Sequence, residues 1–384
     1  MSTTISPQQA DQLRRRAQTF QHEGRYRKAV EVQIELINSL GGYATERSED
    51  MHLLGLYLFQ LGDIAAAETI LTQVFGYQAS DVDVVKNLAI CQLKLGKQDA
   101  AINLLAQCAE QNPENFEVRD VLAHAAGQKG DLSLAHQHGR RALELKHANV
   151  VNKTERVLSL NKPAAKLEMK NPPQNIIAFS LWGKQAKYLD GAIRNAKLAP
   201  DIYPSWRCRF YVDQSVPLVV TDKLRSFGAE IVEMPSPNRA FDGLFWRFLA
   251  ADDPTVSRFI IRDCDAVLNI RERGAVDEWC HSGKHFHVMR DFYTHTELIL
   301  AGMWGGVTKV LPNMAEAIER FTKQLQLRTR IIDQIFLREQ IWPKIYPHTL
   351  VHDSQFGIPE SKDFPEFAVL REGQHVGQDR SIFR

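Results

Sequence analysis

The pattern of apolar and polar positions along the chain changes once, between residues 151 and 174. Before this stretch, glycine and alanine recur at a spacing that is typical of paired helices. After it, short continuous apolar runs alternate with helical segments, as in a sheet with helices on its faces. The pattern therefore predicts an all-α repeat domain over 1–150, a linker over 151–174 and an α/β domain over 175–384.

Four glycines mark the repeat. They are spaced by 38, 34 and 34 residues, and an alanine follows each of them five positions later: Gly24 and Ala29, Gly62 and Ala67, Gly96 and Ala101, Gly130 and Ala135. We expect each glycine to supply the positive φ that ends a first helix, and each alanine to lie where two helices cross. The pattern resembles the tetratricopeptide repeat (TPR), whose period is 34 residues. Such solenoids bind peptides or proteins on a concave face, and a purely scaffolding role is an equal alternative.

The sequence pattern of the second domain predicts alternating strands and helices. Residues 176–181 form a continuous apolar run, as a strand buried on both faces does. Further strands are expected at 208–212, at 230–233 and in a segment that ends at Asp263, with helices at 188–198, 221–227 and 245–250. This alternation predicts a mostly parallel, doubly wound sheet, in which ligands bind beyond the carboxyl ends of the strands.

The last of these strands ends in two carboxylates. Asp263 and Asp265 follow an apolar run at i, i+2 spacing, close enough to share one hard divalent cation such as Mn²⁺ or Mg²⁺. Such a cation can hold a diphosphate and neutralise it as it leaves. The spacing alone is weak evidence, because Asp81 and Asp83 repeat it at what we interpret as the solvated start of a helix.

Composition excludes several classes of protein. A chain of 384 residues with a net charge of +1 gives no reason to expect nucleic acid or an anionic membrane as the main partner. It has neither an apolar run long enough for a membrane span nor the pattern of a signal peptide at its start. Five scattered cysteines are typical of reduced thiols. We therefore expect a cytoplasmic protein. Peripheral association with the inner face of the cell membrane is an open alternative.

Short motifs in the second domain resemble certain bacterial glycosyltransferases. They occur in one order over roughly residues 175–355, at 179–183, 188–192, 210–213, 245–248, 262–265, 271–272, 287–291, 302–306 and 333–334. The resemblance implies a Rossmann-like GT-A fold that uses a nucleotide-sugar, a UDP-sugar being favoured, with Mn²⁺ or Mg²⁺. The acceptor would be a glycan, a lipid-linked molecule or a protein, and the repeats would recruit it or another partner. Ala266 departs from the pattern, because serine is expected after the second aspartate.

Roles for individual residues follow from this reading. The metal ligands would be Asp263, Asp265 and, as a late histidine, His352. The nucleotide-sugar would be contacted by Asp263 and by Trp182, Tyr188, Tyr211, Asp213, Arg247 and Arg262. Proton transfer and orientation would fall to Asp291, Asp333 and Gln334. The sequence leaves open whether the anomeric configuration is inverted or retained, and it does not give the oligomeric state.

Several alternatives remain. His281, His285, His287 and His295 invite interpretation as a zinc site, but we interpret them as packing and hydrogen-bonding residues because no cysteine pair accompanies them. The main rival function is an adaptor or pseudoenzyme, in which the repeats bind partners and the second domain does not catalyse. A nucleotidyltransferase ranks third, because the segment after the first strand contains one glycine rather than a glycine-rich phosphate loop.

Overall fold

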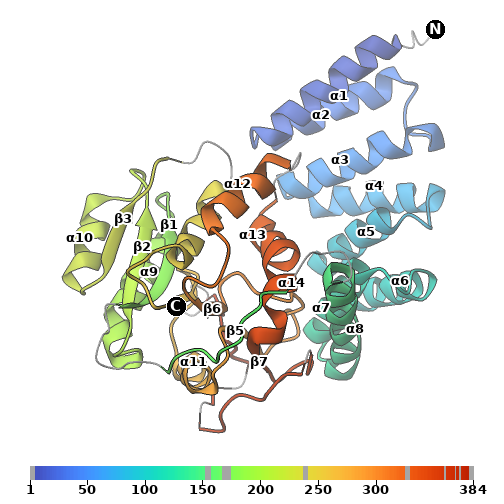
Figure 1. Ribbon diagram of the computed structural model, residues 1–384. Coiled ribbons are helices and arrows are strands. Elements are labelled where there is room, and N and C mark those ends of the chain that lie inside the picture. The colour runs from blue at the N-terminus through green and yellow to red at the C-terminus, as the bar shows by residue number, and fades with distance from the viewer. Residues whose placement is uncertain are drawn as a thin grey trace. The chain divides into compact units, whose positions relative to one another are not determined.

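The computed structural model describes residues 5–151, 157–166, 174–236, 241–324, 329–358, 360–367, 369–371 and 373–379 (Figure 1). The chain divides into two compact units, Met1–Ala142 and Leu143–Arg384. This division falls eight residues before the predicted domain end at 150, because the end of the last repeat helix packs within the second unit. Lys146 is buried there and donates to the carbonyl oxygen of Thr296 at 2.7 Å. Of the predicted linker, residues 152–156 and 167–173 lie outside the described residues.

The first unit is built from helices in antiparallel pairs. Its elements are α1 (Pro7–His22), α2 (Tyr26–Ser39), η1 (Thr45–Arg47), α3 (Ser48–Leu61), α4 (Ile64–Tyr77), α5 (Val82–Lys94), α6 (Gln98–Gln111), α7 (Phe116–Lys129) and the start of α8 (Leu132–Val151). The four repeat glycines all have positive φ, between 73° and 93°, and the four paired alanines are fully buried. The predicted helix ends and helix crossings are therefore confirmed. Asp81 caps α5 through its side chain, as expected for a helix start.

The second unit contains a sheet with helices between its strands. Its elements are β1 (Asn175–Leu181), α9 (Ala186–Ile202), β2 (Arg207–Val212), α10 (Leu218–Ser226), β3 (Glu230–Glu233), η3 (Asp242–Ala251), β4 (Arg258–Ile261), α11 (Ile270–Ser282), β5 (Phe286–Arg290), β6 (Trp304–Val307), α12 (Met314–Gln324), α13 (Ile332–Phe336), η4 (Leu337–Ile341), α14 (Trp342–Ile345), η5 (Tyr346–His348) and β7 (Thr349–Asp353). The strands predicted before Asp263 are present. The helix expected at 245–250 is a tighter 3-10 helix, η3.

The strand order is β3-β2-β1-β4-β6-β5-β7. Strands β1 to β4 pair in parallel, and so do β5 and β7, whereas β6 runs antiparallel to both of its neighbours. The sheet is therefore mixed. The sequence did not foresee the reversal at β6, because its glycine-rich segment lacks the apolar run that marked the other strands.

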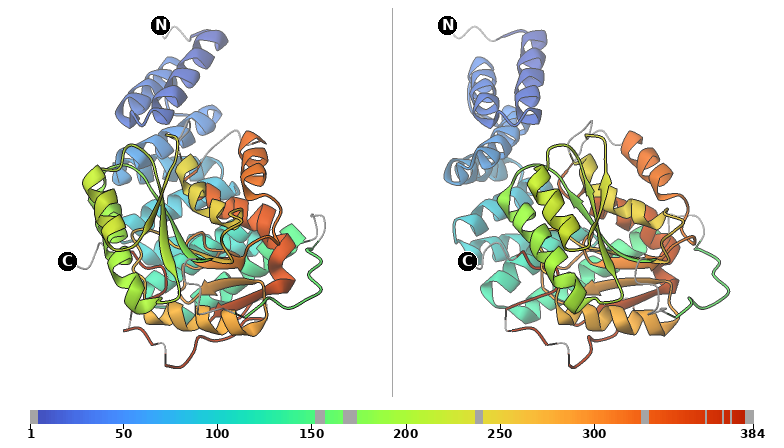
Figure 2. Two further views of the ribbon diagram at one scale, coloured as in Figure 1. Left: turned by 60° about the vertical axis from the view of Figure 1, so that its left-hand side comes forward. Right: turned by 90° about the vertical axis from the view of Figure 1, so that its left-hand side faces the viewer.

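Helices cover both faces of the sheet (Figure 2). On one face, α9, α10 and α11 pack on residues such as Phe179 and Ile260, which alternate with the residues of the other face. The other face, including Phe259 and Ile261, packs against η3, α12, α13 and α14. Two cores therefore sandwich the sheet and fix the positions of its strand ends. Among the described helices, none has the length and apolar character needed to span a membrane.

Candidate functional site at the carboxyl end of β4

The candidate site lies where the strand order reverses. β1 pairs with β2 on one side and with β4 on the other. The chain therefore adds β2 and β3 on one side of β1 and then crosses back to add β4 on the other side. Ligands of α/β sheets bind at this kind of reversal, beyond the carboxyl ends of the strands. Asp263 and Asp265 follow β4 directly and therefore stand at this position.

Asp263 is held by a buried arginine of η3. Arg247 donates from Nη1 to Asp263 Oδ1 and, at 3.1 Å, to the carbonyl oxygen of Arg262. Its Nη2 donates to Asp333 Oδ2 at 3.0 Å. One guanidinium thus bridges two carboxylates, and both ion pairs reduce the penalty for burying its charge. The side chain of Asp263 stays 42% exposed, so it remains accessible to a ligand.

Asp333 has the acidity that a proton-transfer group needs. Burial raises its pKa to about 6, and the attraction of Arg247 opposes the rise. The amide N–H of Gln334 donates to Asp333 Oδ1 at 3.0 Å. A carboxyl group that titrates near neutrality can both take up and release a proton at physiological pH.

Asp265 is paired with a lysine that the sequence analysis did not single out. Lys187, in the first turn of α9, places Nζ 3.0 Å from Asp265 Oδ2 and 3.3 Å from Asp379 Oδ2. Burial raises the pKa of Asp265, with a further contribution from Asp263, and Lys187 opposes this shift. The sequence could have pointed to Lys187 only as a basic residue in the first turn of the helix that follows the first strand.

Gly302 packs directly against the first carboxylate. A Cβ at this position would lie 2.0 Å from Asp263 Oδ2, so only glycine fits without displacing the aspartate. Gly302 is the first residue of the motif at 302–306 and borders Asp263, the first residue of the carboxylate pair. Trp304, in the same segment, is instead a core residue of β6 with no exposed surface.

A cavity of about 210 Å³ opens beside these residues. The residues that line it include Arg247, Asp263, Asp333, Gln334, His295 and Arg330. The structure thus brings four predicted site residues together. The carboxylate oxygens are the ligand type that Mn²⁺ and Mg²⁺ prefer, so the donor set fits such an ion. An ion bound there would compete with Arg247 for Asp263 and with Lys187 for Asp265.

Two predicted donor-site residues are structural. Arg262 is only 1% exposed, and its Nε donates to the buried Glu272 at 2.8 Å, so it does not face a phosphate. The reason is strand alternation, which turns Arg262 away from the side that Asp263 faces. Tyr211 is buried in the core and accepts a hydrogen bond from Arg209 at 3.5 Å, so it offers no stacking surface.

His352 is not placed as a third ligand. It lies on β7 with no exposed surface, and both ring nitrogens are engaged: Nδ1 lies 2.8 Å from His287 Nε2, and Nε2 lies 2.8 Å from Glu278 Oε2. A metal at either nitrogen would have to replace the contact that this nitrogen already makes. The sequence prediction rested on a late position in the chain, which does not report the direction of the side chain.

The remaining predicted residues lie near strand ends. Trp182 is partly buried and meets Trp246 edge to face, with ring centroids 5.9 Å apart. The ring of Tyr188 lies 4.4 Å from Lys187 Nζ. Asp213 is mostly buried and accepts from the amide N–H of Ser215 at 3.0 Å, which fixes the turn after β2.

Asp291 is the second candidate base, and it lies after β5. Arg271 Nε donates to Asp291 Oδ2 at 2.9 Å, and the amide N–H of Val376 donates to Oδ1 at 3.1 Å. Burial raises the pKa of Asp291, and Arg271 opposes the rise. Unlike Asp333, Asp291 does not line the cavity beside Asp263.

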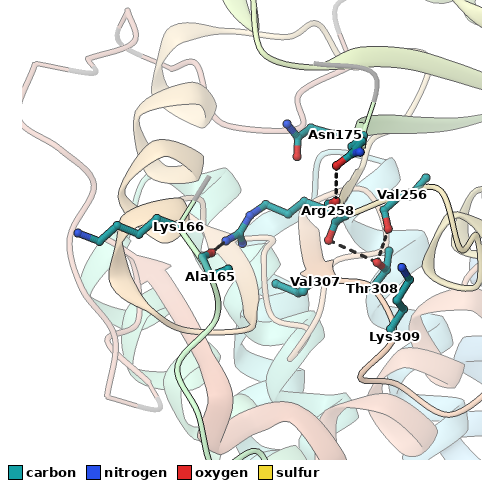
Figure 3. A pocket seen from close by; sticks show the side chains of 10 residues that line it. Ala165, Lys166, Asn175, Val256, Arg258, Val307, Thr308 and Lys309 are labelled. Atoms are coloured by element: carbon teal, nitrogen blue, oxygen red, sulfur yellow. Dashed lines mark hydrogen bonds between the residues drawn. The ribbon is translucent and has the colours of Figure 1, made fainter. Parts of the chain in front are cut away.

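A larger cavity, about 300 Å³, lies at the other end of the strands (Figure 3). Its lining includes Arg258 and Thr308. Arg258 Nη2 donates to the carbonyl oxygen of Ala165, and the Thr308 hydroxyl donates to that of Val256. Arg258 also lies 5.1 Å above the ring of Trp279. No carboxylate lines this cavity, so it offers no ligands of the type expected for Mn²⁺ or Mg²⁺. Its larger volume therefore does not make it the candidate site.

Comparison with known proteins identifies the helical region. Residues 58–145 match the tetratricopeptide repeat family. The first unit contains tetratricopeptide repeats. No curated protein matches the chain.

Similar solved structures cover about a third of the chain. MamA 41-end from Desulfovibrio magneticus RS-1 is 18% identical over 35% of this chain and 75% of that one, with a TM-score of 0.33. Another crystal structure of MamA gives 20% identity, 38% and 82% coverage and a TM-score of 0.34. YrrB, described as a TPR protein with an unusual peptide-binding site, gives 16% identity, 34% and 64% coverage and a TM-score of 0.31.

Proposed function

We propose that the second unit is a metal-dependent glycosyltransferase of the GT-A type that uses a nucleotide-sugar, with a UDP-sugar favoured. The observation that carries the proposal is the position of Asp263 and Asp265, directly after β4 at the reversal of strand order. Their oxygens fit Mn²⁺ or Mg²⁺, and the cavity beside them holds a buried carboxyl group suited to proton transfer.

In this proposal, predicted residues in and beside the cavity divide the chemistry among them. A bound divalent ion would supply Lewis acidity toward the departing diphosphate. Asp263 and Asp265 would hold that ion, and Arg247 would keep Asp263 in place. Asp333 would accept the proton of the acceptor hydroxyl, since its pKa of about 6 leaves it mostly ionised at neutral pH. Gln334, whose amide N–H orients Asp333, would help to position the reacting groups.

The repeats would recruit the acceptor or an assembly partner. TPR arrays bind peptides and proteins on their concave faces, which supports this role. The acceptor would be a glycan, a lipid-linked molecule or a protein.

A second candidate, an adaptor without catalysis, draws on one specific observation. Both carboxylates are already ion-paired, Asp263 with Arg247 and Asp265 with Lys187. In a protein that binds no metal, these pairs would be permanent. The same experiment separates the two candidates.

The experiment is calorimetric titration of the full chain with UDP, GDP, CMP and ADP, each with and without Mn²⁺. We expect one nucleotide to bind only with the metal, and Asp265→Asn to abolish this binding. Asp83→Asn is the matched control, since Asp83 belongs to the other pair of aspartates at i, i+2 spacing and lies on α5 in the first unit. Absence of binding by all four nucleotides would contradict the transferase proposal and favour the adaptor.

A further inference from the structure

A second group of metal-binding side chains lies apart from the carboxylate pair. Asp291 and His295 follow β5, and His375 lies in the C-terminal segment 373–379. One potential ligand atom from each of the three lies within 4.8 Å of the others. The sequence pattern had grouped His295 with His281, His285 and His287, because these residues are close in the chain. The structure gives His295 different neighbours.

The separations match a small coordination sphere. His295 Nδ1 lies 3.6 Å from Asp291 Oδ1. Two ligands at ~2.1 Å from a tetrahedral ion are about 3.4 Å apart, so both atoms can reach one ion with little movement. The rings of His295 and His375 are nearly perpendicular, with centroids 4.9 Å apart. The two rings therefore differ in orientation around the group.

Hydrogen bonds around the group resemble those that support ligands in metal sites. His375 Nδ1 lies 2.8 Å from the carbonyl oxygen of Val376, which leaves Nε2 as the ligand nitrogen. Arg271 and the Val376 amide both donate to the Asp291 carboxylate. Ligating histidines and carboxylates commonly have such outer partners, which fix the ring and the carboxylate in position. The ring of Phe292 stacks on His375 with centroids 4.1 Å apart and further limits its rotation.

The ligand types of the group suit a transition metal. His295 Nδ1 accepts from the amide N–H of Asp291 at 3.1 Å, and a metal would replace this single hydrogen bond. Two imidazoles and one carboxylate favour Zn²⁺, Co²⁺ or Fe²⁺ over Mg²⁺, which prefers oxygen ligands alone.

The buried pair of His287 and His352 shows the contrast. There, one ring nitrogen of His352 contacts His287 and the other contacts Glu278, so both nitrogens of His352 are engaged. For His295 and His375, each ring engages only Nδ1 in a hydrogen bond within the part of the chain that the structure describes. Hydrogen bonds thus occupy both ring nitrogens of His352, whereas His287 Nδ1 is buried without a partner among the described residues. In His295 and His375, Nε2 takes no part in these hydrogen bonds.

We propose that Asp291, His295 and His375 form a binding site for a divalent transition metal of the zinc class, at the edge of the cavity that His295 shares with Asp263 and Asp333. The site is separate from the predicted Mn²⁺ or Mg²⁺ position at Asp263 and Asp265. It does not depend on glycosyl transfer, because its ligands and their supporting residues are present whatever the cavity binds.

The test is titration of metal-free, tag-free full-length protein with Co²⁺, followed by its visible d–d absorption and by calorimetry. We expect one equivalent to bind with histidine coordination and to be displaced by Zn²⁺. His375→Ala and His295→Ala should each lower the affinity by more than about 100-fold, beyond the range expected for outer partners. Asp265→Asn should retain the absorption band, as should His281→Ala, which changes an exposed histidine.

Two results would overturn the proposal. These are absence of the band in the wild type and a band that persists in folded His375→Ala. Folding of each variant is checked by tryptophan fluorescence, since all six tryptophans lie in the second unit. If His375→Ala does not fold, His375→Gln keeps the size of the side chain and replaces it. Failure of nucleotide binding with an intact Co²⁺ band would contradict the transferase proposal alone.

Discussion

The unusual acidity of Asp333 makes a quantitative prediction about stability. The substitution is Asp333→Asn, which keeps the shape of the side chain and removes its titration. Asp333 is 3% exposed, and its ionised carboxylate accepts a hydrogen bond from Arg247. The substitution places a neutral amide beside Arg247 instead. Its effect has two parts: a constant offset from the altered contact with Arg247 and a part that depends on pH.

The part that depends on pH follows from the two pKa values. The carboxyl group titrates near 3.8 in an unfolded chain and at about 6 in the folded protein, which corresponds to about 3 kcal/mol. Because the folded pKa is the higher one, the folded state binds more protons between these values. Ionisation of Asp333 therefore lowers the stability of the wild type as the pH rises through this window, and the loss is complete above about pH 6.

The measurement is urea unfolding of both proteins from about pH 4.5 to about pH 7.5, followed by tryptophan fluorescence. This signal reports the second unit, which contains every tryptophan of the chain. Over this range the free energy of unfolding of Asp333→Asn should rise relative to that of the wild type by about 2 kcal/mol, out of the total of about 3 kcal/mol. Asp201→Asn, at an exposed position of α9, controls for the loss of one charge. A difference that stays constant with pH, or that changes in the opposite direction, would refute the reasoning.

Two further predictions concern glycines. Gly302→Ala would place Cβ 2.0 Å from Asp263 Oδ2 and displace the carboxylate. The affinity for nucleotide in the presence of metal should therefore fall at least about 10-fold, while the thermal unfolding followed by fluorescence stays the same. An unchanged affinity in calorimetry would contradict this prediction. Gly96→Ala has open space around the new Cβ but a φ of 76°, so backbone strain alone should destabilise the repeats by about 1 kcal/mol. Circular dichroism melts measure this, with Ala106→Gly within α6 as a control for helix propensity.

The repeats could be predicted because their signals are local. The positive φ of Gly62 and the complete burial of Ala67 follow from the chemistry of one helix end and one helix crossing. The carboxyl end of β4 was predictable for the same reason, since an apolar run stops where the strand leaves the core. Even the wrong prediction for Arg262 has a local cause, because alternation along the strand points neighbouring residues in opposite directions.

The rest of the candidate site depends on long-range contacts. Arg247 meets Asp333 across 86 positions in the sequence, and both residues were selected only through the family resemblance. His375 reaches Asp291 and His295 from the C-terminal segment, about 80 positions away, and no local periodicity marks it. His352 showed the opposite error, since its late position suggested a ligand while the direction of β7 placed its ring in the core.

The C-terminal segment connects the two candidate metal positions. His375 belongs to the zinc-class group, and Asp379 shares Lys187 with Asp265. If a cation binds Asp265, Lys187 keeps a carboxylate partner 3.3 Å away in Asp379, so its displacement does not leave an unpaired ammonium. The same segment is tied to the carboxylate loop by a strand-like bridge between Ala266 and Asp379. Each of the two positions thus takes one of its charged or ligating groups from residues 373–379, a short stretch that no local pattern in the sequence marked.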